Sequence, residues 1–177
     1  MKMTVTATYD AQNTLTAADA RLAKENQAKV GQVTVTDGKA RVKRDGQDVQ
    51  EFELPKGVIV TSAPDWTDTF LLCRCYDRHK GGKQEFPGLW IHPEQKAQLL
   101  NFSIERVGQQ AIEHDGKKQE LGRYFIRIRN NSQYVAWAND QGRMIKLMSF
   151  PFKDNAGTEM VLEGYEKSAS TLRPPQN

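Results

Sequence analysis

Apolar and polar residues alternate along most of the chain, which is the pattern of β-strands that turn one face towards a core. The alternation is clear at 3–9 and again at 30–36. Asp37-Gly38 and Asp115-Gly116 are typical of the tight turns that join antiparallel strands. Further strands are predicted at 40–42, 49–54, 58–60, 85–91, 98–107, 110–113, 122–129, 134–138, 143–150 and 158–165. Because the loops between them are short, consecutive strands are expected to pair as an antiparallel meander.

The period of the pattern changes in the stretch 64–80. Trp66, Phe70 and Cys73 have the spacing of one helical face there, and Gly81-Gly82 is a typical helix exit. The apolar stripe is wide, which indicates a helix covered on more than one side. We therefore predict a main helix over 64–80 that lies in the hollow of a curved sheet.

A weaker helical signal lies near the N-terminus. Residues 16–28 are rich in alanine and open like a capping box, so a short N-terminal helix is indicated, with an irregular edge strand as the alternative. The fold class expected is mainly β (α+β): a curved antiparallel meander or half-barrel that wraps the helix 64–80. The economical domain division is one β-rich domain, 1–166, followed by a flexible C-terminal tail, 167–177.

Composition and charge narrow the classes of function. The chain has 177 residues, 38% of them hydrophobic, and a net charge of +3, which is too small to argue for nucleic-acid binding. Arg123, Arg127 and Arg129 alternate around Phe125, as in single-strand binders. The same pattern is typical of the outer face of a solvated sheet, which is the interpretation we favour. No apolar run reaches the roughly 18 residues of a membrane-spanning helix.

The two cysteines, Cys73 and Cys75, are too close in sequence for an unstrained disulfide. The three histidines show no zinc-type spacing with them. We expect two free thiols, no metal site and no cofactor. No established catalytic motif is present in the chain, which leaves no nominated catalytic residue.

Aromatic residues supply the candidate ligand-binding set. A sheet curved around a helix encloses an apolar cleft that suits a hydrophobic small molecule or lipid, whereas the alternative is that the same rings fill the core. The candidates are Trp66, Phe70, Trp90, Tyr124, Tyr134 and Trp137. Met144, Met148 and Met160 add soft side chains that suit either adaptable binding or gap filling.

Several segments together resemble bacterial envelope proteins in which an antiparallel sheet curls around a helix as a half-barrel. The segments that carry the likeness are Phe52-Glu53-Leu54-Pro55, the stretch 65–77, Gly81-Gly82 and the stretch 137–147. The periplasmic lipoprotein carriers and related uncharacterised secreted families have this form. The resemblance implies a fold and a location more than an activity. The chain departs from the pattern because it has no export signal and no lipobox cysteine.

Three functions remain open at this point. The first is an envelope-type module that holds an apolar ligand or lipid-like group between sheet and helix. The second is a protein–protein interaction module that pairs through an exposed sheet edge. The third is an enzyme without a recognisable motif, with Arg74, Asp77 and His79 near a cleft mouth. The expected location is periplasmic or secreted, with the export signal removed, and the alternative is cytoplasmic.

Overall fold

A computed structural model of the chain describes residues 2–11, 15–24, 27–44, 46, 48–61, 67–128, 132–150 and 157–174. These residues are mostly in β-strands, and the expected curved antiparallel meander is confirmed. The chain divides into two compact units: Met1–Asp68 with Phe86–Asn101, and Thr69–Glu85 with Phe102–Asn177. The expectation of a single domain over 1–166 stays a prediction. No helix in the described part of the chain has the length and apolar character needed to cross a membrane.

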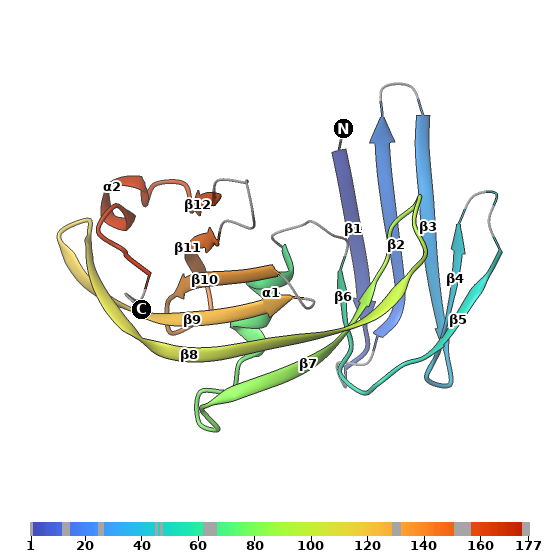
Figure 1. Cartoon of the computed structure of the whole chain (residues 1–177), viewed down its shortest axis with the longest axis horizontal. Helices are drawn as coiled ribbons and strands as arrows, with labels where there is room; N and C mark the ends of the chain where they lie inside the picture. The colour runs from blue at the N-terminus through green and yellow to red at the C-terminus, as the bar shows by residue number, and fades with distance from the viewer. Residues whose placement is uncertain are drawn as a thin grey trace. The chain divides into compact units, whose positions relative to one another are not determined.

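The described residues form the strands and helices labelled in Figure 1. The strands are β1 (Lys2–Tyr9), β2 (Leu15–Lys24), β3 (Gln27–Thr36), β4 (Lys39–Arg44), β5 (Gln50–Glu53), β6 (Ile59–Thr61), β7 (Lys83–Trp90), β8 (Gln98–His114), β9 (Lys117–Ile128), β10 (Ser132–Ala138), β11 (Met144–Ser149) and β12 (Glu159–Val161). The helices are α1 (Thr67–Cys75) and α2 (Glu166–Ala169). One sheet has the order β1-β2-β3-β4-β5, and the other has the order β12-β11-β10-β9-β8-β7-β6.

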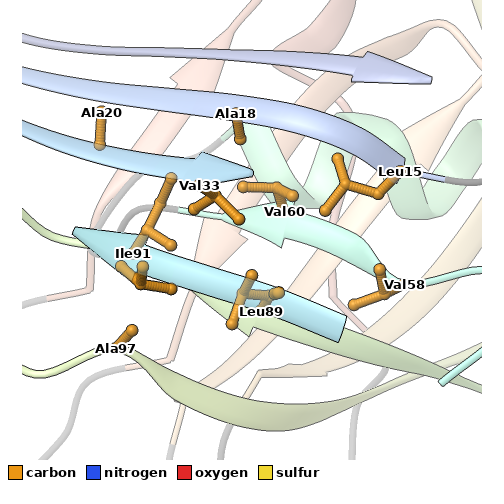
Figure 2. Packing of buried hydrophobic residues seen from close by; sticks show 11 residues of the cluster. Leu15, Ala18, Ala20, Val33, Val58, Val60, Leu89, Ile91 and Ala97 are labelled. Carbon is orange, nitrogen blue, oxygen red and sulfur yellow. The ribbon is translucent and has the colours of Figure 1, made fainter. Parts of the chain in front are cut away.

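The first unit is built on the five-stranded meander β1 to β5. The turn between β3 and β4 follows the sequence prediction, since Asp37 and Gly38 both have positive φ angles. One face of this meander packs on the short parallel pair of β6 and β7 (Figure 2). The shared core consists of small and branched side chains: Leu15, Ala18, Ala20, Val33, Ala40, Val42, Val58, Val60, Leu89, Ile91 and Ala97.

The predicted N-terminal helix at 16–28 is wrong, because the described residues of this stretch lie in β2 and β3. β2 is also not an edge strand, since it pairs with β1 on one side and with β3 on the other. Ala18 and Ala20 turn into the core while Arg21 is exposed, which is a period of two. Pairing on both sides overrides the weak helical preference of alanine.

The second unit contains the curled part of the other sheet, from β8 to β12. β8 and β9 form a long hairpin that ends at Asp115-Gly116, and its tip curves towards α2 (Figure 1). The two strands predicted at 98–107 and 110–113 are one strand with a bulge between Arg106 and Gly108. This single strand gives the hairpin its length.

One face of this sheet carries α1. The helix predicted over 64–80 is confirmed over Thr67–Cys75, and residues 62–66 lie outside the described residues. The prediction is wrong at its C-terminal end, since residues 76–80 are not helical. Leu72 and Cys73 are buried, and the ring of Tyr76, just beyond the helix, meets Tyr124 of β9 edge-on at 5.3 Å. A residue of this helix also contacts β11, since the Thr69 hydroxyl donates to the Met144 sulfur at 3.8 Å.

The opposite face carries the C-terminal segment. Ala169 of α2 and Leu172 are fully buried in a cluster with Trp137 of β10. The ring of His114, at the tip of the hairpin, stacks on Tyr165 at 3.7 Å. The structure thus differs from the flexible tail expected over 167–177: its first residues pack against the sheet, and 175–177 lie outside the described residues.

The turn between β10 and β11 approaches α1 closely, and this generates a stability prediction. A Cβ atom at Gly142 would lie 2.9 Å from the Arg74 Cα and 2.9 Å from the Cys73 carbonyl oxygen, and φ there is +73°. Gly116 has a similar φ of +69° with open space around it. We expect Gly116→Ala to cost about 1–2 kcal/mol. Gly142→Ala should cost about 1–3 kcal/mol more, because helix backbone must also move. Urea denaturation measures both, and equal losses would contradict the close approach.

Candidate functional site

The candidate aromatic residues that the structure describes are divided between the two units. Trp90 is buried in the first unit, where it stacks on His92 at 5.7 Å. Tyr124, Tyr134 and Trp137 belong to β9 and β10 of the second unit. Trp66 lies outside the described residues, and so does the side chain of Phe70.

Within the second unit, Tyr124 and Trp137 lie on opposite faces of the sheet. Tyr124 pairs with Ala136 in the ladder between β9 and β10, and the next residue of β10 is Trp137. Because neighbours along a strand point to opposite faces, the Tyr124 ring turns towards α1 and the Trp137 ring towards the C-terminal segment. Tyr134 shares the face of Tyr124 by the same alternation. These rings therefore pack on two covered faces of the sheet and do not line one shared hollow.

Tyr124 has one polar atom that the surrounding packing leaves without a partner. Its side chain is fully buried, and its hydroxyl has no hydrogen-bond partner among the described residues. Burial raises the pKa of this phenol, against the lowering effect of Arg78 and Arg106. The hydroxyl therefore stays protonated near neutral pH.

Lys146 is the central polar residue on the opposite face. Only 2% of its side chain is exposed, and its ammonium donates to the carbonyl oxygens of Ala169 and Leu172, each at 3.2 Å. The same ammonium pairs with the Glu159 carboxylate at 3.1 Å and lies 5.7 Å from the Trp137 ring centre. One lysine of β11 thus holds the C-terminal segment, β12 and the core together.

Beside this lysine, β12 forms an edge of the sheet. Antiparallel pairs alternate between hydrogen-bonded and free positions. The amide of Leu162 donates to Ile145 O, and the amide of Ser149 donates to Thr158 O, both across the ladder from β11. By this alternation the backbone groups of Glu159 and Val161 point away from β11, and no described strand pairs with them.

Two hollows follow one another along the ladder between β11 and β12. The Met160 hollow has about 140 Å³ and the Phe150 hollow about 290 Å³. The first is lined by Met144, Ile145, Lys146, Met160, Val161, Leu162 and Glu163, and the second by Met148, Ser149, Phe150, Gly157, Thr158, Glu159 and Pro174. Of the three methionines singled out in the sequence, Met144 and Met160 line the first hollow and Met148 lines the second. Thioether side chains adapt to irregular partners.

The chain along this edge is acidic. From Gly157 to Glu166 the sequence contains three glutamates and no lysine or arginine. Glu163 and Glu166 are exposed, and Glu159 is half exposed beside Lys146. We call the outward backbone of β12, the two hollows and these glutamates the β12 edge. It offers apolar recesses, backbone groups that no described strand pairs with, and negative charge.

Of the three residues considered for an enzyme, Arg74, Asp77 and His79, Asp77 has a structural role. The Asp77 carboxylate accepts hydrogen bonds from the amides of His79 at 2.9 Å and Lys80 at 3.2 Å, so it shapes the turn after α1. Arg74 and His79 are exposed. Among the described residues, no group of three or more metal-ligating side chains lies together.

The two cysteines are free, and they differ in environment. Cys73 is buried in the α1 interface, and its burial raises the pKa of the thiol to about 12. Cys75 is exposed, although partial burial of its thiol still raises the pKa against the opposing effect of Arg74. Neither thiol has the lowered pKa of a reactive cysteine.

Comparisons of the chain with protein-family models, with curated proteins and with solved structures found no match. The geometry and chemistry of the β12 edge therefore carry the functional argument. The sequence singled out its methionines and predicted a strand over 158–165, which the structure has over Glu159–Val161. It did not show that this strand lies at the edge of the sheet, because strand order depends on residues far apart in the chain.

Replacing Lys146 tests how the C-terminal segment is held. We expect Lys146→Met to cost about 1.5–3 kcal/mol, the range for hydrogen bonds from a charged donor. Glu159→Gln should cost less than about 1 kcal/mol, because the carboxylate is half exposed. Urea denaturation gives the free energies, and hydrogen exchange should rise at 166–172 in the lysine variant only. Unchanged exchange there would contradict the role given to Lys146.

The thiols predict an order of alkylation. At pH 8 a thiol with a pKa of about 12 is ionised in roughly one molecule in 10⁴, and only the thiolate reacts. Iodoacetamide should therefore modify folded protein at Cys75 first and reach Cys73 only after unfolding in urea. Intact-mass spectrometry with peptide mapping follows both sites. Equal rates at the two cysteines in folded protein would be inconsistent with this burial.

Proposed function

We propose that the protein is an interaction module that binds an extended, basic and apolar segment of a partner protein at the β12 edge. The observation that carries the proposal is the outward backbone of Glu159 and Val161 between two apolar hollows. A peptide strand that adds to a sheet edge uses backbone hydrogen bonds for affinity and side-chain recesses for specificity. The β12 edge offers both.

The sizes of the hollows favour side chains over a whole lipid. Pockets for small-molecule ligands usually have about 300–1,000 Å³. The hollows have about 140 Å³ and 290 Å³, which suits one or two apolar side chains each. They follow one another along β12, and side chains on one face of an added strand would follow the same direction.

The charge of the β12 edge favours a basic partner. Glu163 and Glu166 have no described lysine or arginine paired with them, and Lys146 is already engaged by Glu159 and two carbonyl oxygens. Opposite charge at the rim of an interface chiefly accelerates encounter and rejects partners of like charge. A segment that alternates apolar residues with lysine or arginine satisfies the hollows and the carboxylates together.

An apolar ligand between sheet and α1 is a second proposal with less support. The residues nominated for it lie in different units and on different faces of the sheet. By strand alternation Phe102 and Ile104 share the sheet face of Tyr124, and all three side chains are fully buried. The lipid-like ligand, the periplasmic location and the bacterial-envelope likeness stay predictions.

A synthetic peptide tests the interaction. A short fluorescent peptide that alternates lysine and valine should bind at least about tenfold more tightly than its glutamate–valine counterpart, a difference of about 1.4 kcal/mol. Fluorescence anisotropy gives both affinities. Amide shift changes in NMR spectra should centre on 144–149 and 157–163. Equal affinities, or shifts centred elsewhere, would refute the proposal.

Matched variants separate the contributions of charge and backbone. Glu163→Lys should weaken binding of the basic peptide, whereas Glu113→Lys, an exposed charge change on β8, should leave it unchanged. Val161→Pro removes an outward donor without a ladder hydrogen bond, so it should weaken both peptides while the fold is kept. Circular dichroism checks the fold of each variant.

A further inference from the structure

Arg44 is the last residue of β4 and turns towards the core face of the first unit. Along this strand Ala40, Val42 and Arg44 are buried, while Arg41 and Lys43 are exposed. Only 4% of Arg44 is exposed, and its Nε atom has no hydrogen-bond partner in the part of the chain that the structure describes. Arg41, on the outer face, instead pairs with Glu51 at 3.0 Å. Arg44 forms no ion pair with any residue that the structure describes.

A buried guanidinium without a counter-charge is costly. Arginine keeps its charge throughout the accessible pH range, so it cannot escape the cost by losing a proton. Uncompensated burial of a charge costs several kcal/mol, and buried charges in proteins are consequently paired. The position of Arg44 therefore calls for an anion that the described residues do not supply.

Two backbone segments lie close to the Arg44 side chain. Gly31 of β3 lies directly across the ladder from Arg44. A Cβ atom at Gly31 would be 3.7 Å from the Arg44 Cγ and 3.7 Å from the Pro93 Cα. The arginine stem and the loop at Pro93 thus both lie next to Gly31, where glycine has no side chain between them.

We propose that Arg44, Gly31 and the loop at Pro93 form a binding site for a small oxyanion group, a carboxylate or a phosphate. The planar guanidinium matches either group with two parallel hydrogen bonds. Since the site lies in the first unit, it is independent of the β12 edge of the second unit. Failure of either proposal leaves the other standing.

Thermal unfolding of the full chain with added anions tests the site. Inorganic phosphate and acetate are the probes, and sodium chloride at equal ionic strength is the reference. A ligand that binds only the folded state raises Tm as its concentration rises. The wild type should show this rise with at least one probe, and the preferred probe identifies the oxyanion class. Arg44→Met should lose the whole rise, whereas Arg41→Met should keep it.

NMR titration of the wild type keeps the test independent of variant folding. Amide shifts should saturate and centre on Gly31, Arg44, His92 and Glu94. No rise in the wild type with either probe, an equal rise in Arg44→Met, or shifts that do not saturate at these residues would each overturn the proposal.

Discussion

Burial of both faces of the curled sheet is the constraint on which the second unit depends. α1 covers the face that carries Tyr124, and the C-terminal segment covers the face that carries Trp137. A sheet covered on two sides must satisfy every polar group that the covering segments bring with them. Lys146 does this for the C-terminal segment, since it donates to two of that segment's carbonyl oxygens from within the core.

The same arrangement creates the β12 edge. β12 is three residues long, and one described strand, β11, pairs with it. Lys146 connects the two strands through Glu159, so the anchor of the C-terminal segment is also the anchor of the edge. The hollows on this ladder lie between β11, which packs in the core, and a short strand with few side chains to fill the space. Exposed sheet edges can receive an extended segment as an added strand, and methionine side chains adapt to irregular partners.

The two units handle buried charge in different ways. Lys146 has a carboxylate and two carbonyl oxygens around its ammonium, which is a compensated buried cation. Arg44 has a similar degree of burial, but its Nε has no hydrogen-bond partner among the residues described. This contrast supports the interpretation that Arg44 binds a ligand, whereas Lys146 has a structural role.

Local pattern in the sequence determined most strands, the turns at Asp37-Gly38 and Asp115-Gly116, and the helix α1. Strand period and turn chemistry depend on residues close together in the chain, so they can be read without the fold. The stretch 16–28 was misread because alanine favours a helix locally, whereas pairing on both sides decided for strands. Only the tertiary structure decided which sheet face each segment covers and which strand forms the edge of the sheet. It also decided which groups surround the side chains of Lys146 and Arg44. These outcomes depend on contacts between residues far apart in sequence, and alternation marks two faces of a strand without saying what lies on either.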